Sequence, residues 1–372
     1  MSGLKILHAA DLHLDSPFEG LSAPKASVRR GEGRDLLGRI ADTAVSEGVD
    51  LVLLAGDLLD SDNTFYETGE ELVRSLGRIG APVFIAPGNH DFYSPHSPYA
   101  HLKLPDNIHI FSSGTLECIE LPELRTRVYG AAFTDTRSAP MLRGFHAQRQ
   151  EGYFSVLCMH GEVGARESAY NAVSEQDLAS SGLDYAAFGH VHSASGLLRA
   201  GSTWYSWPGC PEGRGFDETG EKYVYLVDLG SDGSCALRPV SLAGRRYETL
   251  EVDVTGVEPL LAVHTSLPDE TVRDIYRITL TGETDAPPDL RRLYDNLCEF
   301  FFELQLRDRT RIRRSVWERA GEDSLRGLFL LKLRRRYDNA KSDEERSRIE
   351  QAARWGLAAL ENMEEVARHD DQ

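Results

Sequence analysis

Five short apolar segments of this chain are each followed by a small polar cluster. Four of the clusters contain glycine together with aspartate, asparagine or histidine, and the other contains aspartate and histidine. In chain order, the clusters are Asp11-Leu12-His13, Gly56-Asp57, Gly88-Asn89-His90-Asp91, His160-Gly161 and Gly189-His190-Val191-His192. Several of the preceding segments are rich in Val, Ile and Leu, as strands buried on both faces of a sheet should be. Functional groups of open α/β sheets gather beyond the carboxyl ends of the strands. We therefore expect the five clusters to converge on one site.

Between residue 4 and about residue 230, short apolar segments alternate with polar stretches that are long enough to form helices. The expected strands are Leu4–Ala10, Asp50–Ala55, Pro82–Ala86, Tyr153–Met159, Tyr185–Phe188 and Tyr223–Leu229. In the stretch Thr64–Ile79, apolar residues recur at the spacing of one helix face. Strands that alternate with helices are typical of a layered α/β domain, which we expect over residues 1–240.

The pattern changes after about residue 240. Polar and apolar residues alternate over 245–254, as they do in a half-buried strand. The elements expected next are a helix over Pro259–Ser266, a strand over Ile275–Leu280, a helix over Pro288–Phe300 and a strand over Phe301–Leu306. Their order predicts a small separate α+β domain over residues 241–308. Residues 309–372 are expected to be a helical segment, with one helix over Asp343–Val366.

The residue types in the five clusters are those that bind divalent transition-metal ions. Carboxylates and imidazoles without thiolates suit Mn²⁺ and Fe²⁺, and Zn²⁺ accepts the same ligands. Two metal ions about 3.5–4 Å apart need a carboxylate that bridges them and a shared water molecule whose pKa falls towards neutrality. Asp57 is the expected bridge, because it is the only acid in its cluster at the end of a central strand. One metal would be held by Asp11, His13, Asp57 and His192, and the other by Asp57, Asn89, His160 and His190.

His90 follows Asn89 and is left without an expected metal. We expect it to act as a general acid, or to neutralise charge on the phosphoryl or leaving oxygen of a substrate. Asp60, just past the expected bridge, would either support the ligands or be an ordinary loop carboxylate. The other histidines lack such a setting and are expected at the surface or in the core; they are His8, His96, His101, His109, His146, His264 and His369.

The charge balance limits how the chain could bind nucleic acid. With 41 Lys and Arg against 59 Asp and Glu, the net charge is −18, which disfavours binding through the whole surface. Residues 309–341, however, carry 11 basic and 4 acidic side chains. Within this strip, the candidates for contact with DNA phosphates are Arg309, Arg311, Arg313 and Arg314. The same strip also suits an acidic partner surface or a solvated helix face.

Cysteine usage and hydropathy point away from secretion and membranes. The five cysteines are scattered and form no Cys-x-x-Cys pair, which argues against a disulfide framework and a cysteine zinc site. No apolar run approaches the roughly 20 residues that cross a bilayer. Residues 1–5 run straight into a strand pattern without a signal-peptide cleavage site. We expect a cytoplasmic protein with no membrane partner.

The clusters in this order, Asp11-x-His13, Gly56-Asp57, Gly88-Asn89-His90-Asp91, His160-Gly161 and Gly189-His190-x-His192, resemble those of the calcineurin-like metallophosphoesterases. Within that family, residues 7–15 and 56–60 are similar to the DNA repair exonuclease branch. The segment 208–218, followed by Glu221-Lys222, is similar to the YhaO group, which is related to SbcD. The resemblance covers residues 4–230 and, more loosely, 322–360.

This resemblance implies an α/β fold with a four-layer αββα core that binds two Mn²⁺ ions. It also implies a small α+β capping domain that helps to position DNA, with C-terminal helices beyond it. The implied partners are DNA, an SMC-like ATPase with long coiled coils and a second copy of the chain. We therefore expect a Mn²⁺-dependent DNA nuclease, an exonuclease of DNA repair, in which hydroxide activated by two metal ions attacks the phosphodiester.

Two alternatives stay open at this point. The same core could serve a phosphodiesterase or phosphatase that acts on small nucleotides or phosphoproteins. The chain could instead be mainly a scaffolding subunit that binds an ATPase through residues 315–363. The contact face of such a subunit would consist of Leu325, Leu328, Phe329, Leu333, Trp355, Leu357 and Leu360, although apolar residues at helical spacing also suit an internal core.

Overall fold

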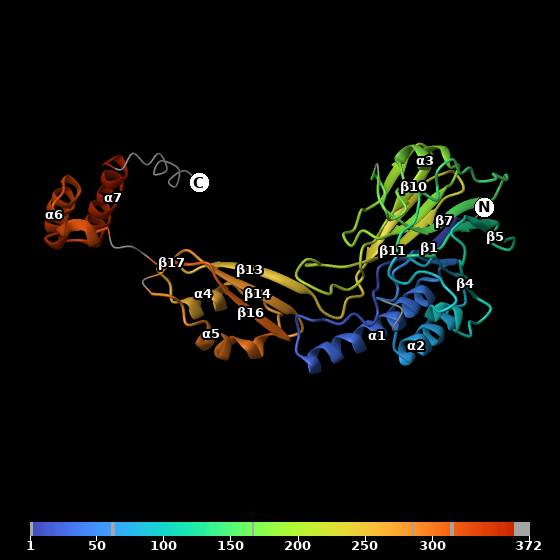
Figure 1. Cartoon of the computed structure of the whole chain (residues 1–372), viewed down its shortest axis with the longest axis horizontal. Helices are drawn as coiled ribbons and strands as arrows, with labels where there is room; N and C mark the ends of the chain where they lie inside the picture. The colour runs from blue at the N-terminus through green and yellow to red at the C-terminus, as the bar shows by residue number, and fades with distance from the viewer. Residues whose placement is uncertain (1–2, 61–63, 166, 285, 313–315, 361–372) are drawn as a thin grey trace. The chain divides into compact units, whose positions relative to one another are not determined.

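The computed structural model describes residues 3–360 apart from 61–63, 166, 285 and 313–315, and Figure 1 shows the course of the chain. Contacts within the chain define two compact units. The first comprises Met1–Leu250, Pro268–Ile278 and Asn296–Gln305, and the second comprises Glu251–Leu267, Thr279–Asp295 and Leu306–Gln372. The domain boundaries that we expect after residues 240 and 308 stay predictions.

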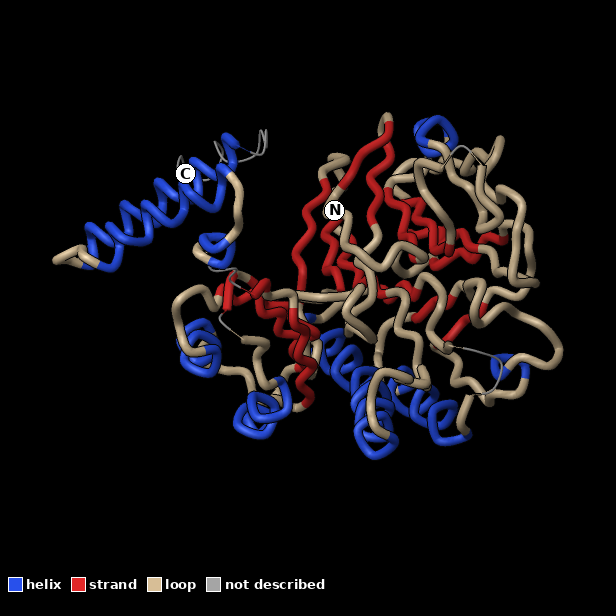
Figure 2. Tube along the Cα trace, turned by 60° about the vertical axis from the view of Figure 1, so that its left-hand side comes forward, coloured by secondary structure: helices blue, strands red, loops and turns tan. Residues whose placement is uncertain are grey.

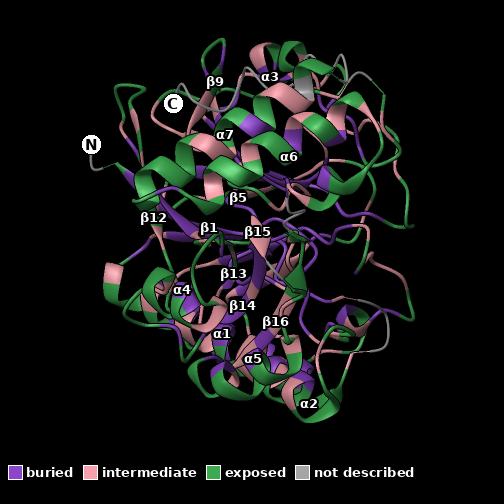
Figure 3. Ribbon diagram, turned by 90° about the vertical axis from the view of Figure 1, so that its left-hand side faces the viewer, coloured by how far each residue is buried: buried purple, intermediate pink, exposed green. Residues whose placement is uncertain are grey.

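The first unit contains a six-stranded sheet with the order β12-β11-β1-β2-β3-β4. Its strands are β1 Leu4–Ala9, β2 Leu51–Leu54, β3 Val83–Ile85, β4 Ile108–Ile110, β11 Val224–Leu229 and β12 Cys235–Val240. Strands β1 to β4 run parallel, whereas β11 is antiparallel to both β1 and β12. Strand β1 is mostly buried (Figure 3). Every residue of β2 and β3, and every residue of β1 except Lys5, is buried, which explains the near-continuous apolar runs.

A second six-stranded sheet has the order β5-β6-β7-β8-β10-β9, and the strands of the sheets are red in Figure 2. Its strands are β5 Glu117–Leu121, β6 Thr126–Gly130, β7 Phe154–His160, β8 Tyr185–Gly189, β9 Leu198–Ala200 and β10 Thr203–Ser206. The two strands that the sequence predicts, β7 and β8, run parallel at the centre, with His160 opposite Gly189. The pairs at both edges are antiparallel.

The two sheets pack face to face, and each is covered on its outer face. Helices α1 (Ala23–Glu47) and α2 (Tyr66–Gly77) lie side by side on the first sheet (Figure 1). On the far face of the second sheet, α3 (Glu175–Ser180) buries Leu178 against Leu157. The core between the sheets includes Ile6, Leu53, Phe84, Val128, Val156 and Ala187. The layers therefore follow the order α, β, β, α, and the predicted α/β core is confirmed.

A three-stranded sheet follows the layered core in the chain, with the order β13-β14-β16. Its strands are β13 Tyr247–Asp253, β14 Ile275–Thr281 and β16 Glu303–Asp308, and the helices between them are α4 Pro259–Ser266 and α5 Leu290–Leu297. A short parallel pair joins β15 (Glu283–Thr284) to β17 (Arg311–Ile312). The three strands of the sheet and the two helices appear in the order that the hydrophobic pattern predicts, whereas β15 and β17 were not expected.

The last described elements are α6 (Leu325–Asp338) and α7 (Asp343–Leu360), which pack against each other. Their shared core is built on Leu330 and Ala353, and Phe329, Leu333 and Leu357 pack against it. Those three partly buried residues therefore take part in the internal packing of the helix pair. Leu325, Leu328, Trp355 and Leu360 are exposed. Among the described residues, no helix is both long and apolar enough to cross a membrane.

Candidate metal centre

The five polar clusters follow β1, β2, β3, β7 and β8, at the carboxyl ends of these strands. Because β1 to β3 and β7 to β8 run parallel in sheets that share a core, these ends come together. Three groups of side chains there could each hold a metal ion, with the ligand atoms within 4.8 Å of one another. The groups are Asp11, His13 and His192; Asp57, His160 and His190; and His13, Asp57 and His90.

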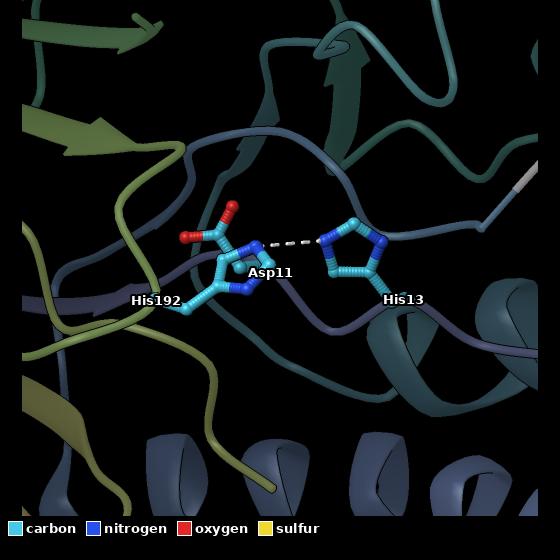
Figure 4. A group of neighbouring side chains, drawn as sticks. All are labelled: Asp11, His13 and His192. Atoms are coloured by element: carbon cyan, nitrogen blue, oxygen red, sulfur yellow. Dashed lines mark hydrogen bonds between the residues drawn. The ribbon is translucent and has the colours of Figure 1, made fainter. Parts of the chain in front are cut away.

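In the first group, the imidazoles of His13 and His192 face each other beside the Asp11 carboxylate (Figure 4). Their Nε2 atoms lie 3.2 Å apart. The Nδ1 atom of His13 lies 3.0 Å from an oxygen of Asp60, and that of His192 lies 2.7 Å from an oxygen of Glu218. When each Nδ1–H donates to its carboxylate, both Nε2 atoms carry a lone pair. The two lone pairs repel each other unless they bind a cation, so this donor set fits a metal ion.

In the second group, the rings of His160 and His190 both contact the side chain of Asn89. The Asn89 Oδ1 lies 3.1 Å from His160 Nε2 and 3.2 Å from His190 Nδ1. Asp57 Oδ2 lies 3.3 Å from His160 Nε2 and 3.7 Å from His13 Nε2, so this one carboxylate faces both groups. The other ring nitrogen of His160 donates to the backbone oxygen of Ala55, at 2.8 Å. His160 Nε2 therefore lies beside two oxygen atoms, Asn89 Oδ1 and Asp57 Oδ2. A cation bound between these atoms would be a shared partner for all three.

The pKa values of the two histidines in the second group are shifted in opposite directions. Burial alone lowers the pKa of His160, but the nearby carboxylates of Asp57 and Asp11 raise it to about 9. Burial raises the pKa of Asp57, but His160 and His13 outweigh burial and hold it below its usual range. Burial, together with the neighbouring His160, lowers the pKa of His190 to about 4. His190 is therefore neutral near pH 7, the form in which an imidazole binds a metal ion.

The backbone at the candidate ligands is strained. The backbone φ values are 55° at Asp11, 43° at His13, 51° at Asp57 and 91° at His190. Residues other than glycine rarely adopt a positive φ. Such strain costs of order 1–3 kcal/mol for each residue and concentrates at functional sites. Gly56 allows the backbone before Asp57 to approach the ring of His160 closely, because a Cβ at this position would lie 2.6 Å from His160 Nδ1.

The buried carboxylate of Asp91 ties the loops after β2 and β3 together. It accepts hydrogen bonds from the backbone N–H groups of Asp57, Leu58, Leu59 and Gly88, at 2.7–3.2 Å. The hydroxyl of Tyr99 donates a further bond of 2.5 Å. Because Gly88 immediately precedes Asn89, this single side chain fixes the loops that carry both Asp57 and Asn89.

Replacing Asp91 with Ala is expected to destabilise the first unit by about 3–5 kcal/mol, because four buried N–H donors lose their acceptor. Urea denaturation followed by circular dichroism measures this change. Asp106, which is exposed, provides the matched control, and Asp106→Ala should stay within about 0.5 kcal/mol of the parent protein. A loss below about 1 kcal/mol for Asp91→Ala would show that water replaces the carboxylate.

His90 lies at the edge of the centre and is exposed. Its backbone N–H donates to Asp57 Oδ1 over 2.9 Å, and its ring centre lies 4.8 Å from that of His13. His90 also belongs to one of the groups that could hold a metal ion, which the sequence analysis did not anticipate.

Three polar side chains around the first group were given no definite role by sequence reasoning. Asp60 and Glu218 hold the Nδ1 atoms of His13 and His192, and Arg214 donates to both carboxylates. Burial raises the pKa of Glu218, but hydrogen bonds from His192 and Arg214 outweigh it and leave the pKa below its usual range. Arg214 and Glu218 lie in the segment 208–218 that carries the YhaO resemblance, which was the only signal for them.

The remaining candidates that the structure describes belong to none of the three candidate groups. His8 is a satisfied core histidine, as expected: its ring contacts the Tyr185 hydroxyl at 2.8 Å and the Phe188 oxygen at 2.9 Å. Burial lowers its pKa to about 3. Arg309 and Arg311 belong to the second unit. Arg313 and Arg314 lie outside the described residues.

The chain is similar to a known protein family and to several curated proteins. The family model described as calcineurin-like phosphoesterase matches residues 4–194. The uncharacterized metallophosphoesterase YhaO of Bacillus subtilis is 30% identical over 72% of this chain and 68% of its own length. The DNA double-strand break repair protein Mre11 of Saccharolobus solfataricus is 24% identical over 75% of this chain and 76% of its own. A component of the nuclease SbcCD of Bacillus subtilis is 25% identical over 60% of this chain and 66% of its own.

Proposed function

The chain belongs to the calcineurin-like phosphoesterase family, and from that premise we propose that it is a metal-dependent nuclease that hydrolyses phosphodiester bonds in DNA. The observation that carries this proposal is the pair of histidine–aspartate groups that both face the Asp57 carboxylate. Divalent cations held there would lower the pKa of a water molecule and neutralise charge on the phosphoryl oxygens.

The proposed ligands fall into two sets that share Asp57. They are Asp11, His13, Asp57 and His192 for one ion, and Asp57, Asn89, His160 and His190 for the other. Mn²⁺ is the proposed metal, and Fe²⁺ and Zn²⁺ suit the same donors. Asp60 and Glu218 hold the rings of His13 and His192 through their Nδ1 atoms, which leaves each Nε2 available as a ligand.

His90 is the proposed general acid of the reaction. Its exposed side chain can meet a substrate that binds over the centre, while its backbone N–H remains bonded to Asp57. From this place the imidazole would donate a proton to the leaving oxygen of the phosphodiester, so that the leaving group departs as an alcohol.

DNA is proposed as the substrate on two grounds. Two of the relatives are named as a DNA double-strand break repair protein and as a component of a nuclease. The second unit also carries exposed basic side chains, among them Arg309 and Arg311. With Arg313 and Arg314, which lie outside the described residues, they are proposed to contact DNA phosphates.

An SMC-like ATPase is the proposed protein partner, bound through α6 and α7. Leu325, Leu328 and Trp355 are 72%, 58% and 53% exposed on this helix pair, so it presents apolar side chains that its own packing does not cover. A second copy of the chain is the other proposed partner.

The test is degradation of end-labelled single- and double-stranded DNA with Mn²⁺, with a chelator as the control. The same preparation is offered a chromogenic phosphodiester, cyclic nucleotides and a phosphopeptide. We expect metal-dependent cleavage of DNA, with a product ladder that reveals the direction of digestion. If DNA stays intact while a small phosphoester is hydrolysed, the nuclease proposal is wrong.

A further inference from the structure

One guanidinium joins the two carboxylates that hold the histidines of the first group. Arg214 Nη1 donates to Asp60 Oδ1 over 3.2 Å, and Arg214 Nη2 donates to Glu218 Oε1 over 2.7 Å. These are the same oxygen atoms that contact His13 Nδ1 and His192 Nδ1, at 3.0 and 2.7 Å. Arg214 therefore links the supports of two histidines that lie 179 positions apart in the chain.

The segment that carries Arg214 is fixed independently of the centre. The neighbouring Glu212 accepts hydrogen bonds from Arg29 (2.5 Å) and Arg39 (3.0 Å) of helix α1, and Arg29 is only 1% exposed. The backbone oxygen of Gly213 accepts a further bond of 3.0 Å from Arg29. These bonds fix the backbone on the N-terminal side of Arg214 against α1. Its own N–H then donates to Glu218 Oε2 over 2.8 Å.

We propose that Arg214 is a positioning residue that sets the orientation of His13 and His192 through Asp60 and Glu218. This inference rests on the proposed function, because it assigns the two rings to a metal ion. A guanidinium presents several donors in a rigid plane, so it can bond two carboxylates at fixed angles. With the carboxylates held, each Nδ1–H has a fixed acceptor and both Nε2 atoms point to the same place.

This role differs from that of a simple counter-charge. The positive charge of Arg214 repels a metal ion, so its removal would strengthen metal binding if charge alone mattered. If orientation matters, removal weakens binding even though a repulsive charge is lost. Lysine retains the charge, but its compact ammonium on a flexible stem lacks the rigid planar donors that hold both carboxylates at fixed angles. Arg214→Lys and Arg214→Gln therefore separate the two explanations.

The experiment measures Mn²⁺ binding by calorimetry and electron paramagnetic resonance, with the full chain and without substrate. The parent protein is expected to bind two ions and to give the spectrum of a coupled pair. In Arg214→Lys and Arg214→Gln alike, the affinity for one ion should fall about 10- to 100-fold. At equimolar Mn²⁺, their spectra should show an isolated ion.

Arg143, which is exposed, supplies the matched control, and Arg143→Gln should bind both ions as the parent does. Circular dichroism verifies that each variant folds. The inference is wrong if both Arg214 variants bind two ions with parental affinity, if their affinity rises, or if Arg214→Lys alone behaves as the parent. If the parent itself binds no Mn²⁺ at micromolar concentrations, the proposed function fails together with this inference.

Discussion

Replacing Asp57 with Asn is expected to reduce the binding of both metal ions and to lower phosphodiester hydrolysis by roughly a thousandfold or more. The reason is geometric, because Asp57 Oδ2 lies 3.7 Å from His13 Nε2 and 3.3 Å from His160 Nε2. No other carboxylate in the three candidate groups belongs to more than one of them. An amide keeps the shape of the side chain but removes the negative charge that both ions would share.

Elemental analysis after gel filtration measures the metal bound to each variant. Asp228, an exposed residue of β11, provides the control, and Asp228→Asn should retain both ions. A variant that loses one ion only would place Asp57 in a single set. Unchanged metal content in Asp57→Asn would contradict the assignment of Asp57 as a ligand altogether.

Strands with an uninterrupted apolar run and several helices were the predictable part of this fold, whereas β6, buried at four of its five positions, was missed. The apolar run Leu4–Ala10 predicts β1 (Leu4–Ala9), and the expected helix Pro259–Ser266 is α4 with the same bounds. Such elements bury a continuous apolar run or stripe, which leaves a clear pattern in the sequence. Edge strands leave a weaker one: β5 alternates partly buried and exposed residues, and β9 is three residues long. Sequence analysis missed both for that reason.

The candidate site divides in a similar way. The proposed ligands are recognisable because each lies at the carboxyl end of a strand or a few residues beyond it, and the sheet topology then brings them together. The residues that hold the ligands in place could not be recognised in this way, because their contacts depend on the path of long loops. Asp60 and Arg214 are 154 positions apart and meet only in the folded chain. Asp91 was visible in its cluster, but its backbone partners on the loop after β2 were not.

Replacing His90 with Ala should leave the metal content unchanged and lower the turnover of DNA by about 10²- to 10⁴-fold, as expected for the loss of a general acid. His101, which is also exposed, provides the control, and His101→Ala should cleave DNA at the parental rate. Metal lost from His90→Ala would instead identify His90 as a ligand, as its place in the group with His13 and Asp57 allows.

A substrate with a good leaving group separates the two roles that sequence analysis left open for His90. Nitrophenolate leaves without a proton, so the general acid contributes little when a nitrophenyl phosphodiester is hydrolysed. If His90 donates a proton, His90→Ala should hydrolyse this substrate at close to the parental rate while it fails on DNA. If His90 neutralises charge on the phosphoryl oxygens, both substrates should lose activity to a similar extent, because that charge develops with either leaving group. The ring is exposed at the edge of the centre, with its centre 4.8 Å from that of His13, so it can reach the leaving oxygen of a bound substrate, and we expect the first outcome.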